Sequence, residues 1–147
     1  MDSLDHIHTL PTGSTTITKS MLDAIREQKQ ITHVIIPLGV TRIDEGAFED
    51  CKNLTSITIP DSVTSIGSGA FEGCKSLTSI TIPNSVTTIR EHAFHNCKSL
   101  SSITIPKHVT VIEPAAFYSC ESLTSITIPE SVTSIGIRAF GNCSSLT

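Results

Sequence analysis

The sequence has few aromatic residues, no long apolar run and no excess of positive charge. It contains no Trp, one Tyr and five Phe among 147 residues. No apolar run approaches the roughly 18 residues that cross a bilayer, and the N-terminus is acidic where a secretory signal would be basic and then apolar. A net charge of −4 argues against a nucleic-acid partner, because such proteins carry a basic patch. We expect one domain without membrane insertion, and the missing export signal favours the cytoplasm.

Catalytic and metal-binding motifs are also missing. No Ser lies in a Gly-x-Ser-x-Gly turn, no Gly-rich loop matches a phosphate cradle, and paired acids such as Asp44 and Glu45 are adjacent in sequence instead of converging. His92 and His95 would share one side of a helical turn, but no second cluster supplies further ligands. We therefore predict no enzyme, no cofactor and no metal site, with these histidines exposed to solvent.

What the chain has in abundance is Ser, Thr and Ile, and this bias comes from a repeat. Each of the three residue types occurs 20 times. Cysteine, phenylalanine and proline each recur with a constant step of 23 residues. The repeated positions are Cys51, Cys74, Cys97, Cys120 and Cys143, then Phe48, Phe71, Phe94, Phe117 and Phe140, then Pro37, Pro60, Pro83, Pro106 and Pro129. Four complete Cys-to-Cys units therefore follow a degenerate one.

Each unit has the pattern of a strand followed by a second short segment and a helical turn. In the first Cys-to-Cys unit, apolar and polar residues alternate over residues 55–59, which predicts a β-strand. Pro60 ends the strand because proline has no amide proton. A second short segment, either extended or turning, is expected at Val63 and Ile66, and a helical turn at Ala70 and Phe71 returns the chain.

One such unit cannot bury its own apolar side, whereas stacked copies can. Each strand is expected to pair in parallel with its neighbour about 4.8 Å away. The sequence therefore predicts a β-rich α/β fold, a right-handed solenoid of parallel strands with short helical turns on the opposite side. Five cysteines cannot all pair with one another, and their inward position favours a packing role over a metal or disulfide role.

The motif Cys-x-x-Leu-x-x-Ile-x-Ile-Pro-x-Ser-Val-x-x-Ile-x-x-x-Ala-Phe, found from Cys51 to Phe71, resembles the leucine-rich repeats of the BspA-like or Treponema pallidum class. The resemblance extends over residues 31–147. Members of this class are often bacterial or protist surface proteins, and some resemble adhesins for host matrix proteins. The resemblance therefore implies a leucine-rich-repeat solenoid that binds protein, and it implies nothing about catalysis.

The N-terminal part departs from the repeat. Residues 1–18 are expected to be a leader that is partly mobile. The solenoid is then expected to span 19–147, with a helical cap at 20–30 and repeats over 31–147. The cap is predicted to be an amphipathic helix from Ser20 to Lys29, with Ser20 as its N-terminal cap.

The C-terminal coil has no such cover. Its apolar face and strand edge are expected to be open, so the chain is a fragment of a longer array, a second copy closes the end, or the end is simply frayed. A fragment would favour a cell-surface location. The sequence thus predicts a non-enzymatic protein–protein interaction module. The alternative is a structural or adhesive segment of a longer BspA-like surface array that self-associates through its last coil.

The outward strand positions form the candidate binding face, because they repeat an uncharged pattern of hydroxyl groups. Two interpretations remain open: a broad face for a partner, or hydroxyls that favour strands and hydrogen-bond across neighbouring coils. The strand exit varies most and forms a candidate rim, where selectivity could reside. The face comprises Ser56, Thr58, Ser79, Thr81, Ser102, Thr104, Ser125 and Thr127, and the rim comprises Asp61, Asn84, Lys107 and Glu130.

A column of lysines precedes the strands. It consists of Lys29, Lys52, Lys75 and Lys98, followed by Glu121. Lysines at about 5 Å intervals repel one another, so they indicate either attraction for an anionic partner or protection against edge aggregation. Of these two, we favour protection.

Overall fold

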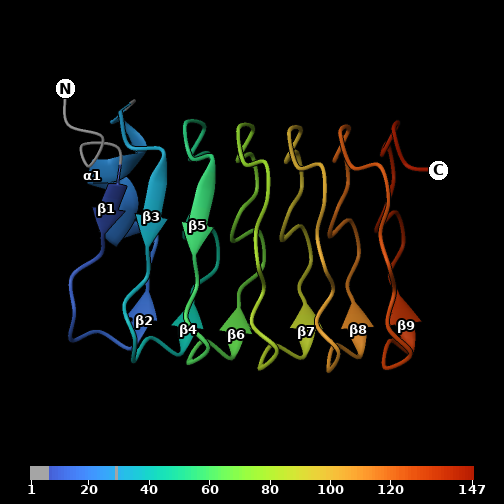
Figure 1. The fold of residues 1–147 in the computed structure, drawn as a ribbon, viewed down its shortest axis with the longest axis horizontal. Coiled ribbons are helices and arrows are strands. Elements are labelled where there is room, and N and C mark those ends of the chain that lie inside the picture. The colour runs from blue at the N-terminus through green and yellow to red at the C-terminus, as the bar shows by residue number, and fades with distance from the viewer. Residues whose placement is uncertain (1–6, 29) are drawn as a thin grey trace.

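The structure, a computed structural model, describes residues 7–28 and 30–147. The chain winds into about six coils that stack side by side along one axis (Figure 1). A 23-residue unit buries its apolar side only against its neighbours, and this requirement produces the stack. The predicted leucine-rich-repeat solenoid of parallel strands is confirmed.

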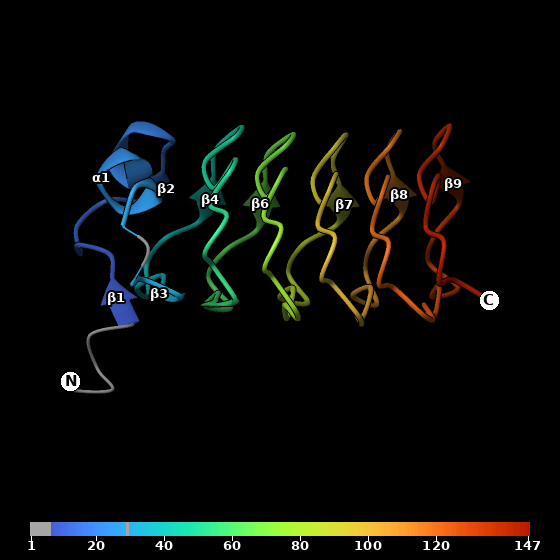
Figure 2. The ribbon, with the colours of Figure 1, turned by 90° about the horizontal axis from the view of Figure 1, so that it is seen from above.

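Short strands lie on two faces of the solenoid, and all of them pair in parallel (Figure 2). The first face, called the strand face below, contains β1 (Ile7–Thr9), β3 (His33–Ile35) and β5 (Ser56–Thr58). The second face contains two three-stranded sheets, β2–β4–β6 and β7–β8–β9. Their strands are β2 (Thr16–Ile17), β4 (Arg42–Ile43), β6 (Ser65–Ile66), β7 (Thr88–Ile89), β8 (Val111–Ile112) and β9 (Ser134–Ile135).

The ladder on the strand face is shorter than the sequence predicts. Beyond β5, in the part of the chain that the structure describes, the extended segments keep one main-chain bond per pair of coils. The amides of Thr78 and Ser101 each donate to the preceding coil at 3.2 Å, and that of Thr124 at 3.5 Å. The second face keeps its parallel pairing over the same coils, in β7, β8 and β9.

The predicted helical turn at Ala70 and Phe71 is wrong in its helical character. Each coil instead has tight turns there, with residues in the left-handed region such as Gly69 and Ala115 at φ 60° and 55°. A left-handed residue stops a right-handed helix. The amides of the turn donate to the next coil, as from Phe71 to the carbonyl of Ala93 at 2.9 Å. The turns therefore help to hold neighbouring coils together.

The helical cap is present but short. It consists of a 3₁₀ helix, η2 (Ser20–Leu22), and one α-helical turn, α1 (Asp23–Arg26). Leu22 and Ile25 are buried against the first coils, in agreement with the amphipathic pattern. Ser20 does not cap the helix: the cap position is Lys19, and it makes no side-chain cap bond. Lys29, the predicted end of the helix, lies outside the described residues.

Most of the predicted leader belongs to the solenoid. β1 pairs with β3 and β2 pairs with β4, so residues 7–17 form a first coil. The partners Ile7 and His33 are 26 positions apart, whereas His33 and Ser56 are 23 apart. Three extra residues accommodate the cap and place this coil out of step with the repeat. Residues 1–6 of the predicted leader lie outside the described residues.

Phenylalanine and cysteine form two of the inward columns of the core. The rings of Phe48, Phe71, Phe94, Phe117 and Phe140 stack nearly parallel along the axis. All five cysteines are free, and four of them donate an Sγ hydrogen bond to a phenylalanine carbonyl of the preceding coil at 3.1–3.2 Å. The cysteine column therefore has a packing role in the core.

Candidate binding surface

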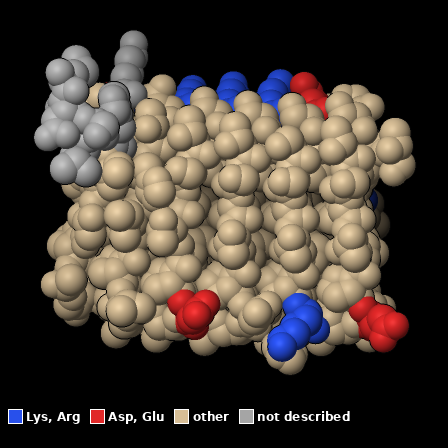
Figure 3. Space-filling view, viewed as in Figure 1, with Lys and Arg blue, Asp and Glu red and all other residues tan. Residues whose placement is uncertain are grey.

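The eight predicted face residues lie in two adjacent rows along the strand face. Seven of them are exposed and Ser56 is half-buried, while Ile57, Ile80 and Ile103 between the rows point into the core. Alternation along an extended chain produces this division between water and core. Figure 3 shows that the face carries charged side chains only along two of its edges.

The eight hydroxyls are not equivalent. The His33 ring bridges the first pair, with its Nδ1 3.0 Å from Ser56 Oγ and its Nε2 2.8 Å from Thr58 Oγ1. The other six have no hydrogen-bond partner within the described residues 7–28 and 30–147. These six are Ser79, Thr81, Ser102, Thr104, Ser125 and Thr127. Hydrogen bonding from coil to coil therefore does not account for them, and they face solvent as open donors and acceptors.

Hydroxyls at other columns do bind the coils together. Thr55 and Thr78 each donate from Oγ1 to the carbonyl of the preceding coil, at 3.0 and 3.3 Å. Thr64 and Thr133 do the same on the second face, at 3.3 and 3.2 Å. The chain thus uses one residue type for two purposes, and only the open hydroxyls remain available to a partner.

A shallow depression of about 590 Å³ crosses the three coils that carry the six open hydroxyls, and these six residues line it. A second depression of about 290 Å³ adjoins it and is lined by Asp61 and Asn84 of the rim. The two share Ile80, Thr81 and Thr104. The structure therefore joins the face to the first half of the rim. The two remaining rim residues, Lys107 and Glu130, are exposed and line neither depression.

The chemistry of this surface is hydrogen bonding without charge. The surface has no acid, base or thiol among the residues that line the larger depression. The cysteines lie in the core, where burial raises the pKa of Cys51 to about 11 and that of Cys120 to about 12. Burial holds the pKa of Cys74 and Cys97 well above 9 as well. These thiols stay protonated at neutral pH and are poor nucleophiles.

His92 and His95 lie close together, as their spacing predicted. The rings of His92 and His95 lie 5.2 Å apart, and His95 Nδ1 is 3.1 Å from Glu72 Oε1. No group of three or more His, Cys, Asp or Glu side chains within residues 7–28 and 30–147 could hold a metal ion.

Among the helices of the described segments, none has the length and apolarity required to span a membrane.

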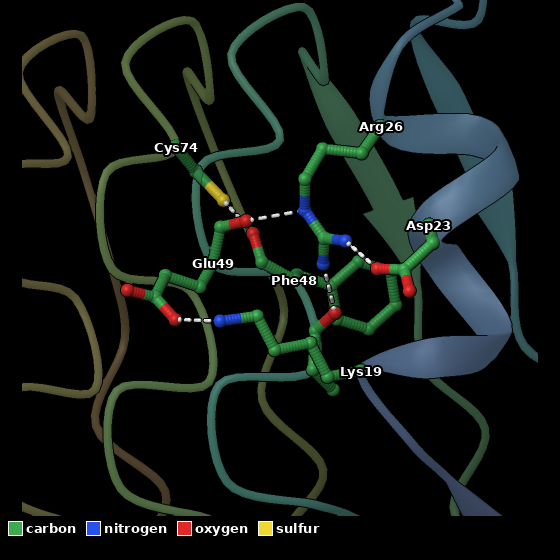
Figure 4. Close-up of polar contacts among 7 residues, drawn as sticks. Lys19, Asp23, Arg26, Phe48, Glu49 and Cys74 are labelled. Atoms are coloured by element: carbon green, nitrogen blue, oxygen red, sulfur yellow. Dashed lines mark hydrogen bonds and ion pairs between the residues drawn. The ribbon is translucent and has the colours of Figure 1, made fainter.

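Arg26 forms the contact between the cap and the first coils, a role that the sequence did not reveal (Figure 4). Its Nε donates to the carbonyl of Glu49 at 2.7 Å and its terminal NH2 donates to that of Ala47 at 2.9 Å. In the inner coils, amides of the preceding turn satisfy the equivalent carbonyls, as Phe48 does for Ala70. The guanidinium thus bonds two carbonyls whose equivalents in the inner coils are bonded by amides.

Ion pairs hold Arg26 and the cap in place. Arg26 contacts Asp23 at 2.5 Å, and Lys19 contacts the Glu49 carboxylate at 2.5 Å.

A gap of about 10 Å³ remains between α1 and the coil below it, lined by Leu22, Ile25 and Phe48 among others. That volume fits a single water molecule and is far too small for a ligand. The strand face therefore remains the candidate surface.

Comparison with known proteins agrees with this architecture. The chain is similar to a leucine rich cell surface protein from Faecalibacterium prausnitzii, with 46% identity and a TM-score of 0.77 over 79% of this chain and 31% of that one. It is also similar to the T. pallidum leucine rich repeat protein, with 39% identity and a TM-score of 0.76 over 79% and 56%. A Bacteroides ovatus leucine-rich repeat protein has 41% identity and a TM-score of 0.75 over 78% and 32%.

The chain therefore spans about a third to just over half of the length of these proteins. No curated protein matches it. The profile of the BspA type leucine rich repeat region matches residues 15–147 in six copies. That match begins within the predicted leader, where the structure places the first coil. The chain belongs to the BspA-type leucine-rich-repeat family.

Proposed function

We propose that this chain is a non-enzymatic binding module that holds a protein partner on its strand face. The observation that carries the proposal is the set of six open hydroxyls on the larger depression, at Ser79, Thr81, Ser102, Thr104, Ser125 and Thr127. Each hydroxyl both donates and accepts, so the face suits the main-chain and side-chain polar groups of a partner. The family fold, which is typically a non-enzymatic scaffold, supports the same function.

The adjoining rim gives this face a means of selectivity. Asp61 and Asn84 line the smaller depression, and Lys107 and Glu130 continue the same column on the next two coils. From coil to coil the rim presents an acid, an amide, a cation and an acid, whereas the face beside it repeats the same Ser and Thr residues. Rim charges contribute mainly to the choice and orientation of a partner, and hydrogen bonds on the face contribute more to holding it.

Two double variants test the proposal. A protein array probed with the labelled chain supplies binders, and each binder is then measured against the chain with Ser79→Glu and Thr81→Glu. The two new carboxylates would sit in the depression without cations to pair with, and an uncompensated charge in an interface costs several kcal/mol. We expect at least a 30-fold loss of affinity, which corresponds to about 2 kcal/mol.

The matched control is the chain with Thr87→Glu and Thr110→Glu, two exposed threonines on the second face. It has the same net charge as the test variant, and we expect it to retain the affinity of the original chain. Equal loss in both variants, no loss in the first, or an array without binders would each refute the strand-face proposal.

We propose self-association as a second candidate, because the last coil exposes isoleucine. Ile135 and Ile137 are exposed, whereas Ile112 and Ile89, which match Ile135 in the inner coils, are buried. The cell-surface description of the Faecalibacterium prausnitzii relative is consistent with such contacts in a structural or adhesive array. β9 is also an end strand of its sheet and is free to pair.

Sedimentation velocity over a range of concentrations tests self-association. Ile137 is 79% exposed, so Ile137→Glu leaves the core intact and is expected to shift a dimer to monomer. The control is Leu38→Glu, which changes a side chain 85% exposed and distant from the last coil. Monomer at every concentration in the unmodified chain, or dissociation by the control alone, would refute this candidate.

A further inference from the structure

A histidine lies on the strand face outside the larger depression and joins the first pair of hydroxyls. Ser56 Oγ lies 3.0 Å from His33 Nδ1, and Thr58 Oγ1 lies 2.8 Å from His33 Nε2. Both distances are within hydrogen-bond range. These three residues are called the histidine cluster below. The other three hydroxyl pairs of the face have no hydrogen-bond partner within residues 7–28 and 30–147.

The pairing of β3 with β5 assembles the histidine cluster. His33 lies opposite Ser56 in the register of these parallel strands, and Thr58 follows Ser56 by two residues. Residues two apart in a strand project from the same side of the sheet, so all three side chains point outward. His33 and Ser56 are half-buried and Thr58 is exposed. A small reagent can therefore approach the cluster from solvent.

The two hydrogen bonds give the imidazole a defined role. A neutral imidazole has one nitrogen that donates and one that accepts. Because each nitrogen of His33 faces a hydroxyl, one hydroxyl accepts the ring proton and the other donates to the basic nitrogen, whichever tautomer is present. With the proton on Nε2, Thr58 Oγ1 accepts it and Ser56 Oγ donates to Nδ1. A hydroxyl that donates to a base oriented by a third group is the general arrangement of an activated nucleophile.

We propose that His33 acts as a general base for Ser56 and makes this hydroxyl an acceptor of acyl groups from activated esters. Ser56 Oγ attacks the carbonyl carbon of the ester and forms a new C–O bond, while its proton passes to His33 Nδ1. The bond from that carbon to the leaving oxygen then breaks, and the leaving group takes the proton from the imidazolium. Ser56 is left as an ester and His33 is neutral again. The chain is acylated once without turnover, so this reaction is separate from the binding function proposed above.

The neighbouring coils supply a comparison that isolates the effect of the base. The column of Ser56 continues with Ser79, Ser102 and Ser125, but the coil before each of these three carries a serine at the place of His33. A positioned general base accelerates a reaction about 10²–10⁴-fold. In the histidine cluster a neutral hydroxyl orients the ring at the place where a serine hydrolase has a carboxylate, so the lower value applies. Half-burial of Ser56 reduces it further, and we expect Ser56 to react at least about ten-fold faster than the other serines of its column.

The experiment treats the full chain with p-nitrophenyl acetate, an activated ester, and follows acetylation of each residue by peptide mass spectrometry. Acetylation of Ser56 should be at least about ten-fold faster than that of Ser79. His33→Gln keeps a side chain that can hydrogen-bond both hydroxyls but has no basic nitrogen, so Ser56 should then react no faster than Ser79. The matched control is His8→Gln, which removes a histidine of β1 that alternates away from the face. In the control Ser56 should react as fast as in the original chain.

The rates of Ser56 and Ser79 are compared within the original chain, so the test does not depend on whether a variant folds. A threonine hydroxyl is crowded by the methyl group on the same carbon, so the acetyl group should lie on Ser56 and not on Thr58. Equal rates at Ser56 and Ser79, or acetylation of Thr58 instead, would overturn the inference. Fast acetylation in His33→Gln, or slow acetylation in His8→Gln, would overturn it as well. These outcomes leave the protein-binding proposal intact, because that proposal depends on the open hydroxyls of the depression.

Discussion

Replacement of Arg26 should destabilise the N-terminal end of the solenoid. The side chain is 14% exposed and satisfies the carbonyls of Ala47 and Glu49. A hydrogen bond from a charged donor contributes about 1.5–3 kcal/mol. Water can reach part of the vacated site, so the lower value applies to each bond, and Arg26→Ala should lower the free energy of unfolding by about 3 kcal/mol. The contact with Asp23, which is mostly exposed, adds less than about 1 kcal/mol.

Urea denaturation followed by circular dichroism measures this loss. With an m value of about 2 kcal/mol/M, the midpoint should fall by about 1.5 M. Arg26→Lys keeps the charge but reaches only one carbonyl, so its urea midpoint should lie between those of the original chain and Arg26→Ala. The control is Arg42→Ala, which removes an arginine that is 60% exposed and paired with Asp44, and it should cost at most about 0.5 kcal/mol. If Arg26→Ala costs no more than Arg42→Ala, the guanidinium does not cap the coil.

Three further predictions follow from the core and the turns. Phe94→Ala should cost about 3–5 kcal/mol in the free energy of unfolding, and Phe140→Ala clearly less, since Phe140 stacks on one side only; equal costs would contradict the column. Ala115→Gly should raise the melting temperature, because Ala115 has φ 55°, whereas Ala116→Gly should lower it. Above pH 9 the free energy of unfolding should fall as pH rises, because burial raises the thiol pKa values and the unfolded chain releases those protons first. In pH-dependent urea melts, Cys97→Ala should reduce the slope of this free energy against pH by about 1.4 kcal/mol per pH unit. An unchanged slope would contradict the burial argument.

The repeat itself was predictable because burial fixes it. Alternation around Ile57 specifies a strand with one face in the core, and the 23-residue step specifies which residues stack. The first coil was not predictable in this way. Its strands pair 26 positions apart, since the cap inserts three residues, and a search at a constant step therefore reads residues 7–18 as a leader.

The turns were misjudged because apolar spacing does not encode the sign of φ. Glu113 to Phe117 has the composition of a helical turn, with Pro114 near its start. Ala115 nevertheless adopts a left-handed conformation, and its amide donates to Ile137 in the next coil at 3.0 Å. Contacts between coils decide this conformation, and they are absent from any single unit.

The candidate surface was predictable as a row of hydroxyls, but the state of each hydroxyl was not. Thr55 and Thr81 are both threonines of the 23-residue repeat. Thr55 donates to the carbonyl of Thr32, whereas Thr81 is open on the depression. Likewise, His33 occupies the column of Ser56 and closes the first pair of hydroxyls. These differences depend on distances between coils, and only the three-dimensional structure contains them.

Hydrogen exchange of the chain with a captured partner tests most directly whether the strand face is the binding surface. The account predicts that the partner slows exchange of the amides at Thr81, Thr104 and Thr127, on the open hydroxyl rows. Amides of β7 and β8 on the second face should exchange at the same rate with and without the partner. Protection confined to β7 and β8, or none on the strand face, would contradict the account.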